Sequence, residues 1–566
     1  MSIKPALMKL PINTADDGFY RGFSQIVTVT SKVLIGGLVV WAIAFPEQSG
    51  AVLNKINAAI LSSFGAWYIW TVTLFVLMCI GLAIWPTGGR LKLGQASDVP
   101  EFSNFSWFSM MFGAGIGVGM LTWAVAEPVY HFNNNPEVIQ GITNGGTADN
   151  IRMAYKWSFL HWGLGAWACY AIAGLALGYF SYRRGLPLTM RSSLTPLFGS
   201  KLSGSLGHVV DVVAVVATIL GVAQTLGFGV EQFVAGLTRI GIGGLTNEAG
   251  TANTAGVLVA IIVIMVASTL SALSGVGKGI KWLSNLNMGL SIALLTFFLL
   301  FGSTFFGLQA LFVGIWDYLI ALPDMSFRVW SGDGNPDSVA SKLEGWQGGW
   351  SVFYWAWWIA FAPFVGLFLA RISKGRTIRE FVLGAMIVPS LMCFVWFTWA
   401  GGTAIDLTMQ QVAAGTIETV KDGEIFKASD GDKIFAMTSY MLTPISTVLA
   451  WLMSLMIVVL LMTYLVTTAD SAVLIVNTIN AAGDEGPKAR PHIIFWGVAL
   501  GAVVAALLLV GGLKAIQTAM VIGALPFSLV MVLQCFALVK AIYNDGRREQ
   551  AGLATTAAEV ETTAGE

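Results

Sequence analysis

Charged residues are scarce in this sequence. Lys, Arg, Asp and Glu make up 11% of the 566 residues. Soluble domains carry about 25%, so this chain cannot give several soluble domains a hydrated surface. The 31 basic and 31 acidic residues cancel, which excludes the concentrated basic face that nucleic-acid binding needs. Hydrophobic residues make up 56% of the chain, and most of it is therefore predicted to lie in lipid.

Cysteine and histidine are also rare. The four cysteines all fall inside apolar stretches and show no metal or redox spacing, which predicts small core residues: Cys79, Cys169, Cys393 and Cys535. The four histidines are scattered and no HExxH motif occurs: His131, His161, His208 and His492. We therefore expect a protein that is not an enzyme. An intramembrane enzyme and a membrane sensor without transport stay open as remote alternatives.

Long hydrophobic runs are abundant, in contrast. A bilayer core of about 30 Å needs roughly 20 apolar helical residues per crossing, and this length predicts an all-α integral membrane protein with about 12 transmembrane helices. The predicted spans are 26–45, 64–85, 105–126, 154–180, 208–237, 255–274, 284–306, 350–371, 378–404, 441–470, 491–511 and 516–541. Residues 1–25 carry charges and prolines without a compact apolar run, so they are predicted to be a tail rather than a cleaved signal.

The distribution of Lys and Arg predicts the orientation, because short cytoplasmic loops retain them. With the N-terminal tail inside, inside segments hold 20 of the 31, outside segments hold 9 and the spans hold 2. Both termini are therefore predicted to be cytoplasmic. The loops 307–349 and 405–440 fall outside and are long and acidic. The amphipathic stretch LQALFVGIWDYLIAL in the first of these loops is predicted to lie along the membrane surface.

Glycine clusters in the third span, MMFGAGIGVGMLTWAVAEP, at alternate positions from 113 to 119. Small residues four apart can simply let two helices pack closely. Alternatively the segment is unwound, which is tolerated at membrane depth only where it lines a cavity. In the eighth span Pro363 is predicted to interrupt a second helix. If the two spans are equivalent, each opens a five-helix repeat, as in transporters with discontinuous helices.

These boundaries predict six parts of the chain. They are a cytoplasmic N-terminal tail (1–25), two peripheral helices (26–104), a first five-helix repeat (105–306), an external loop with an amphipathic helix (307–349), a second inverted repeat (350–541) and a short cytoplasmic C-terminal tail (542–566).

Aromatic residues gather in the middle of two spans rather than only at their ends. Trp162, Trp167 and Tyr170 lie in the fourth span, and Trp357 and Trp358 in the eighth. Interfacial belts are the usual explanation for membrane tryptophans, but ring faces at mid-depth can form a cage for a quaternary ammonium group. We predict no acid at mid-depth, because Glu127 is placed at the end of the third span, and Asp211, Glu231 and Asp470 also lie toward span ends.

Hydroxyl oxygens near the end of the tenth span offer a second kind of site. Thr467, Thr468 and the carbonyl of Tyr464 are hard ligands that suit a monovalent cation. Threonines in helices more often bond to the carbonyl groups of the preceding turn, and the sequence leaves both interpretations open.

Taken together, GAGIGVG, HWxxxxWxxY, SGVGKGIKWLSNLNM (274–288), YWAWWIAFAPFVGLFLARISKGRTIREF (354–381) and TTADSA resemble the betaine/choline/carnitine transporter family over roughly residues 25–545. The resemblance implies a LeuT-like fold, with two inverted five-helix repeats preceded by two helices. It also implies a homotrimer in the cell inner (plasma) membrane that moves onium compounds.

The resemblance also implies roles for individual residues. The family's aromatic box corresponds to Trp162, Trp167, Tyr170 and Trp358, with Trp357 adjacent. Independently of the resemblance, an unwound glycine segment is expected to hold a substrate carboxylate through backbone amides at Gly115, Gly117 and Gly119. The principal sodium site corresponds to Gly113, Ile116, Tyr464, Thr467 and Thr468. A second sodium site corresponds to Thr218, Val222 and Phe364, so one hydroxyl of that site is missing.

Departures from the family's pattern narrow the expected function. Choline carriers of the family tend to have an aspartate where this chain has Gly119. The best-known betaine carrier of the family has a tryptophan where this chain has Phe361. Near the expected pocket, Gln224 and Thr225 stand where small residues are expected. The tail after Arg548 is short and mildly acidic, which argues against strong osmotic activation. We expect a sodium-coupled symporter for a zwitterionic onium compound such as glycine betaine, dimethylsulfoniopropionate or ectoine. A sodium-independent carnitine-type exchanger and a proton-coupled choline carrier are the alternatives.

Overall fold

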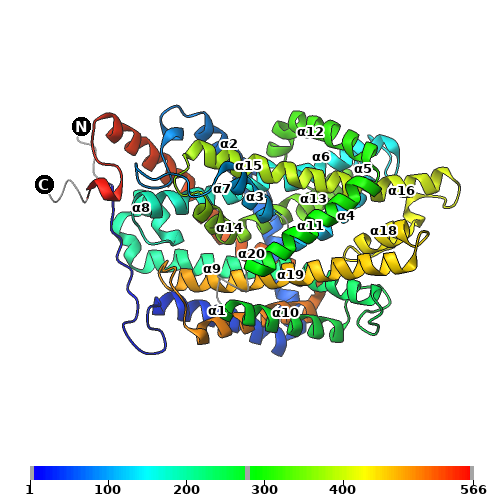
Figure 1. Ribbon diagram of the computed structural model, residues 1–566, viewed down its shortest axis with the longest axis horizontal. Helices are drawn as coiled ribbons and strands as arrows, with labels where there is room; N and C mark the ends of the chain where they lie inside the picture. The colour runs from blue at the N-terminus through cyan, green and yellow to red at the C-terminus, as the bar shows by residue number, and fades with distance from the viewer. Residues whose placement is uncertain (1–5, 116, 275–280, 561–566) are drawn as a thin grey trace.

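The computed structural model describes residues 6–115, 117–274 and 281–560, and within these ranges all regular secondary structure apart from isolated bridges is helical. Lipid enforces this, because a backbone that crosses it must satisfy its own hydrogen bonds. The prediction of an all-α membrane protein is confirmed. The long helices are α1 (Gln25–Ala44), α2 (Pro46–Ile84), α9 (Ser205–Arg239), α10 (Thr254–Ser274), α11 (Lys281–Phe301), α12 (Thr304–Phe327), α14 (Phe353–Ile372), α15 (Ile378–Trp396), α19 (Thr447–Asn480) and α20 (Arg490–Gln550) (Figure 1).

The third and fourth predicted spans are each divided into two helices. They form α3 (Asn104–Gly115) with α4 (Val118–Asn133), and α6 (Ile151–Trp162) with α7 (Leu164–Gly178). The glycine cluster thus marks a break, as one of the two interpretations predicted. The break at Gly163 was not predicted. The shorter helices are α5 (Pro136–Ile139), α8 (Thr195–Phe198), α13 (Val339–Gln347), α16 (Gly402–Ala413), α17 (Glu424–Lys427) and α18 (Lys433–Leu442).

The eighth predicted span is not broken, and the sequence prediction was wrong on this point. The helix α14 runs without interruption through Pro363 to Ile372. Proline removes one backbone donor, but its fixed φ is compatible with a helix, and neighbouring helices in a membrane protein can hold such a segment together. Because α14 is continuous, a shared break cannot be used to argue that α14 and the third span are equivalent.

Eleven helical stretches among the described residues are long and apolar enough to cross a membrane. That set includes α12, omits the broken α3–α4 pair and counts α20 once. The backbone of α20 leaves helical geometry at Gly511 and at Gly512, whose φ of 63° favours glycine, so α20 contains two predicted spans. Both termini lie at the same end of the molecule (Figure 1), which requires an even number of crossings. The helices give twelve crossings if the α3–α4 pair counts as one crossing, α20 as two and α12 as none.

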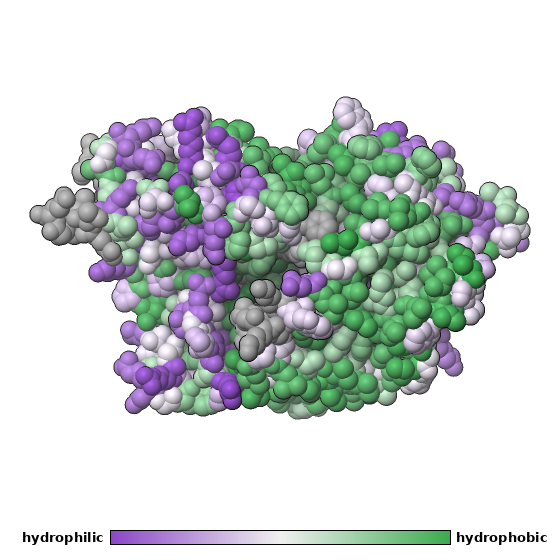
Figure 2. All heavy atoms as spheres, viewed as in Figure 1, coloured by the Kyte–Doolittle hydropathy of each residue, from purple (hydrophilic) through white to green (hydrophobic). Residues whose placement is uncertain are grey.

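The packing of the helices crosses between the two predicted repeats. The helix α7 packs on α14, while α15 packs on α3, and α9 packs on both α19 and α20. Helices of the first predicted repeat therefore pack on helices of the second, and the two do not form separate units. Hydrophobic residues cover much of the face in Figure 2, and hydrophilic residues gather toward the end that carries the termini. On α10 the exposed apolar side chains include Leu258, Val259, Ile262, Val263 and Val266.

Two glycines bring α7 and α14 into close contact. A Cβ atom at Gly174 would lie 2.9 Å from the carbonyl oxygen of Gly366, and a Cβ at Gly366 would lie 2.8 Å from the Cβ of Ala173. Neither backbone can yield without moving its helix. The approach matters because these two helices carry four of the five predicted cage residues.

We predict that Gly174→Ala or Gly366→Ala lowers the free energy of unfolding by about 1–3 kcal/mol, the usual effect of overpacking a tight interface. The fraction of detergent-solubilised protein that stays monodisperse after heating would measure this loss. Gly37→Ala is the matched control, because a Cβ there would meet nothing within 4 Å. Equal melting of all three variants would contradict the importance of this contact.

Candidate ligand-binding site

A cavity of about 630 Å³ lies between the broken helices, α14 and α19. It brings together most of the residues that the sequence singled out, although they come from four separate regions of the chain. The predicted residues that line it are Gly113, Gly117, Gly119, Trp162, Trp167, Tyr170, Trp357, Trp358, Phe364, Tyr464, Thr467 and Thr468.

Among the predicted residues whose surroundings are described, Thr218 is not part of this lining. Gly115 is the last residue of α3, and only its place in that helix is described. Thr218 is fully buried in α9, where its hydroxyl donates to the carbonyl of Ala214 at 2.7 Å. Ile116 lies outside the described residues. Of the second predicted sodium set, only Phe364 reaches the cavity.

The aromatic rings meet around Trp358. Trp162 meets it nearly at a right angle, with ring centroids 5.0 Å apart, and Tyr170 does the same at 6.1 Å. Trp357 stacks on its other side at 4.8 Å, while Trp167 contacts Tyr170 at 5.3 Å. Each of these five side chains is at most 6% exposed. Ring faces set at right angles in a nearly dry site are the arrangement that attracts an onium group.

The indole N–H groups of Trp358, Trp167 and Trp357 all donate hydrogen bonds to the protein. The indole N–H of Trp358 donates to the carbonyl of His161 at 2.9 Å, and that of Trp167 donates to the carbonyl of Trp162 at 3.2 Å. Trp357 donates to the hydroxyl of Thr225 at 3.2 Å. These bonds hold the rings by their edges, so their faces are held in fixed directions.

The break at Gly163 makes part of this arrangement possible. It separates Trp162, the last residue of α6, from Trp167 in the first turns of α7. A Cβ at Gly163 would lie 2.4 Å from the carbonyl oxygen of Phe159, so only glycine fits there. The HWGLGAW sequence offers a signal, since Gly163 follows the first cage tryptophan directly.

The third span supplies backbone groups rather than side chains. Gly117 is extended, with φ −166° and ψ −173°, and precedes the first turn of α4. The first N–H groups of a helix lack partners within it and carry partial positive charge. A Cβ at Gly119 would lie 2.9 Å from the Trp357 ring and 3.5 Å from the Trp162 ring. The glycines therefore let this backbone lie directly against the aromatic rings.

Oxygen atoms gather farther along the cavity on α19. The hydroxyl of Thr467 donates to the carbonyls of Thr463 at 3.0 Å and Tyr464 at 3.2 Å, as the plainer of the two interpretations expects. The side-chain amide of Asn287 donates to the same hydroxyl at 3.1 Å. Thr467, Thr468 and Asn287 all line the cavity. Asn287 was not predicted from the sequence.

The cavity runs toward the end of the molecule that carries the termini. On α14 its lining continues from Trp358 to Arg371, a distance of about 20 Å at 1.5 Å per residue. Its walls become more accessible along the way, since Phe368 is 37% exposed while Trp357 is 2% exposed. The last residue of α19, Asn480, accepts a hydrogen bond from the N–H of Ser24 beside the N-terminal segment.

A buried acid lies behind the cage, and the prediction that no acid occurs at mid-depth was wrong for Glu127. Its carboxylate is fully buried and accepts a hydrogen bond from the indole N–H of Trp162 at 2.7 Å. The break at Gly117 explains the error. Because α4 begins only at Val118 and continues to Asn133, Glu127 lies inside the helix rather than at its end.

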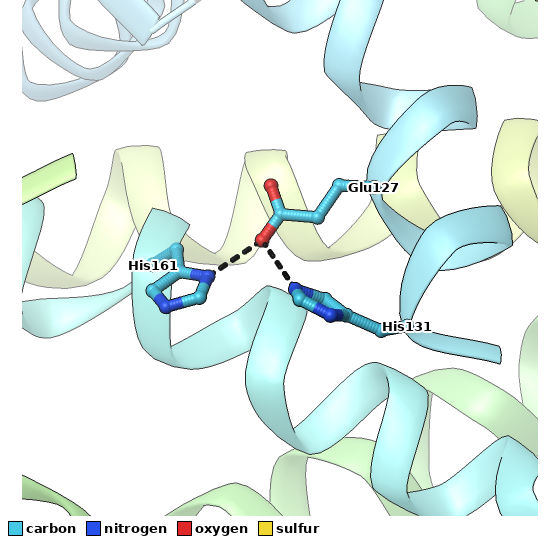
Figure 3. Close-up of side chains that lie close together, drawn as sticks. All are labelled: Glu127, His131 and His161. Atoms are coloured by element: carbon cyan, nitrogen blue, oxygen red, sulfur yellow. Dashed lines mark hydrogen bonds and ion pairs between the residues drawn. The ribbon is translucent and has the colours of Figure 1, made fainter. Parts of the chain in front are cut away.

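Two histidines, described as scattered on the basis of sequence, meet at this acid. His161 Nδ1 lies 2.7 Å and His131 Nε2 lies 3.3 Å from the same carboxylate oxygen of Glu127. Figure 3 shows the three side chains pointing toward one another, with His131 one turn from Glu127 on α4 and His161 on α6. None of the three lines the cavity. We call these three residues the Glu127 cluster.

The sequence matches the model of the betaine/carnitine/choline family of transporters over residues 26–547. Among similar proteins, a probable glycine betaine transporter of Desulfitobacterium hafniense is 38% identical over 90% of this chain and 95% of its own length. A glycine betaine transporter of Bacillus subtilis is 38% identical, covering 90% and 92%. An osmo-independent choline transporter of Acinetobacter baylyi is 36% identical, covering 89% and 90%.

These matches extend across the cavity, the broken helices and nearly all of the helical fold. The family and these relatives are transporters and not enzymes. The chain is therefore a multi-pass membrane protein that belongs to the betaine/carnitine/choline transporter family.

Proposed function

We propose that this protein is a sodium-coupled symporter that imports a small zwitterionic onium compound. The observation that carries the proposal is the composition of one cavity. Aromatic ring faces line it beside the start of α4, and hydroxyl oxygens line it farther along α19. The onium head of the substrate, its carboxylate and a sodium ion would each have a suitable partner there.

The aromatic cage would hold the onium head. Its rings are close enough to one another for a cation that lies against them to be within about 6 Å of several centroids, the range of a cation–π contact. Such a contact gains strength where water is excluded, and the cage rings are almost completely buried.

The start of α4 would hold the carboxylate of the same molecule. Helix N-termini bind anions through free N–H groups and the helix dipole, and Gly119 lines the cavity in the first turn of α4, against the rings of Trp357 and Trp162. A zwitterion with a short spacer would therefore have its two charges within reach of both partners. The glycine at position 119 leaves this site without a side-chain charge, which favours a zwitterion over choline.

Sodium would bind between the end of α3 and α19. The carbonyl end of a helix carries partial negative charge, and Gly113 lies in the last turn of α3. Thr467 and Thr468 face the same cavity and would add hydroxyl oxygens. Sodium that binds one conformation more tightly than another would couple uptake to the sodium gradient by shifting populations.

The open end of the cavity lies toward the termini, so an inward-facing arrangement follows if both termini are cytoplasmic. We further propose that the protein works in the cell inner membrane as a homotrimer, as the family resemblance implies. A choline carrier is the second candidate, because one relative bears that name.

Uptake into proteoliposomes tests the function. Radiolabelled glycine betaine, dimethylsulfoniopropionate, ectoine, carnitine and choline would be compared with and without an inward sodium gradient. The proposal expects uptake of a zwitterion that rises with sodium. Sodium-independent exchange of carnitine, or proton-driven uptake of choline, would replace it with one of the alternatives.

We predict that Trp358→Ala abolishes uptake, because it removes the ring that contacts Trp162, Tyr170 and Trp357. Trp358→Phe should retain part of the uptake, since it keeps a ring face. Initial uptake rates at equal amounts of membrane protein would measure both. Trp316→Ala is the control, because this α12 side chain is 64% exposed. Uptake by Trp358→Ala at the rate of the unmodified protein would refute the cage.

We predict that Thr467→Ala combined with Thr468→Ala removes the dependence of uptake on sodium, because it deletes both hydroxyl ligands. Initial rates over a range of sodium concentrations would show the change. Thr463→Ala is the matched control, since Thr463 lies one turn earlier on α19, does not line the cavity, and its hydroxyl donates to the carbonyls of Val459 and Leu460. Unchanged sodium activation in the double variant would refute this site.

A further inference from the structure

We propose that Glu127 supplies the negative charge of the aromatic cage from behind the Trp162 ring. This inference rests on the proposed function, because it concerns how the same cavity holds an onium head. Glu127 would act through Trp162 without touching the substrate, and is therefore a positioning residue.

The carboxylate has four hydrogen-bond partners. One oxygen faces the two imidazoles, and the other accepts the indole N–H of Trp162 at 2.7 Å and the hydroxyl of Tyr354 at 2.5 Å. Hydrogen bonds of this kind offset part of the cost that burial imposes on a charged carboxylate. Among the described residues, its ion-pair partners are only the two histidines, and the structure shows no Lys or Arg paired with it.

The hydrogen bond to Trp162 links this charge to the cavity. An anion that accepts the N–H of an indole draws the proton toward itself and leaves more electron density on the ring, in the way hydrogen-bond chains polarise one another. The attraction of a cation to a ring face depends on that density. Because the site is nearly dry, the carboxylate itself also attracts a cation on the far side of the ring with little screening.

The same cluster holds a second cage residue in place. His161 bonds to Glu127 through Nδ1 and to Ser351 through Nε2, while its carbonyl accepts the N–H of Trp358 at 2.9 Å. Its ring stacks on Tyr354 at 4.8 Å. The carboxylate thus joins α4, α6 and α14 at the point where the cage is assembled.

A metal site is the competing interpretation of this cluster. One nitrogen or oxygen atom from each of the three residues lies within 4.8 Å of the others, and two histidines with a glutamate are known zinc ligands. However, the oxygen that faces both imidazoles lies within hydrogen-bond distance of each, and the other oxygen accepts from Trp162 and Tyr354. The hydrogen-bond network therefore accounts for the geometry without an ion.

The chain contains a matched control for this interaction. Glu137 accepts the indole N–H of Trp157 at 2.7 Å, the same distance as in the Glu127–Trp162 pair. Both tryptophans lie on α6. Glu137 is partly exposed and also pairs with Lys156. Neither Glu137 nor Trp157 lines the cavity.

The experiment compares glycine betaine with its carbon isostere tert-butylacetate, in which a neutral tert-butyl group replaces the trimethylammonium head. Both compounds would compete with radiolabelled glycine betaine for binding to purified protein. We predict that Glu127→Gln weakens glycine betaine binding by about tenfold or more, the effect of losing a charge-assisted contact. Binding of tert-butylacetate should stay nearly unchanged, so the preference for the onium head falls. Glu137→Gln should alter neither affinity.

A double-mutant cycle separates the charge effect from misfolding. Trp162→Phe keeps a ring but cannot donate to Glu127, so Glu127→Gln should weaken binding much less in that background. Equal weakening of both ligands by Glu127→Gln, or no change in either, would overturn the inference. Inhibition by micromolar Zn²⁺ that disappears in Glu127→Gln would overturn it in favour of a metal site. If the unmodified protein binds no glycine betaine, the betaine form of the proposed function fails instead.

Discussion

An organic cation that crosses a bilayer must leave water without meeting a medium that rejects its charge, and the proposed function places this constraint on the residues around the cavity. An isolated charge in a dry site is costly unless something compensates it. Here the compensating groups are distributed. The ring faces of Trp162 and Trp358 lie at the cavity, whereas the carboxylate of Glu127 lies one hydrogen bond behind. This arrangement keeps a formal negative charge out of contact with the substrate, which would bring a carboxylate of its own.

The break in the third span places backbone groups beside those rings. An intact helix would bury its N–H groups in internal hydrogen bonds, so the third span is interrupted at Gly117 and begins again at Val118. The bare Gly119 then lets the new helix lie against Trp357. The contact between Gly174 and Gly366 brings α7 and α14 close enough for Tyr170 to reach Trp358. Glycine is therefore abundant for two reasons, interruption and close approach.

The sequence predicted the fold and much of the candidate site, and the gaps have physical causes. Spans are visible because lipid selects about 20 apolar residues at a time, and the cage because its residues form local motifs. Glu127 was misplaced because its partner Trp162 is 35 residues away, and hydropathy carries no information on such contacts. The break predicted at Pro363 was wrong because the sequence shows only that proline lacks a backbone N–H. The packing around α14 decides whether the helix stays intact.

The two interpretations of the threonines on α19 turn out to be compatible. A hydroxyl has one proton and two lone pairs. In Thr467 the proton is directed at the carbonyls of Thr463 and Tyr464, and one lone pair accepts the amide N–H of Asn287. Under the proposed function, the second lone pair would bind a cation in the cavity. Bonding to the preceding turn would then orient the oxygen for sodium rather than compete with it, because the proton is already held away from the site.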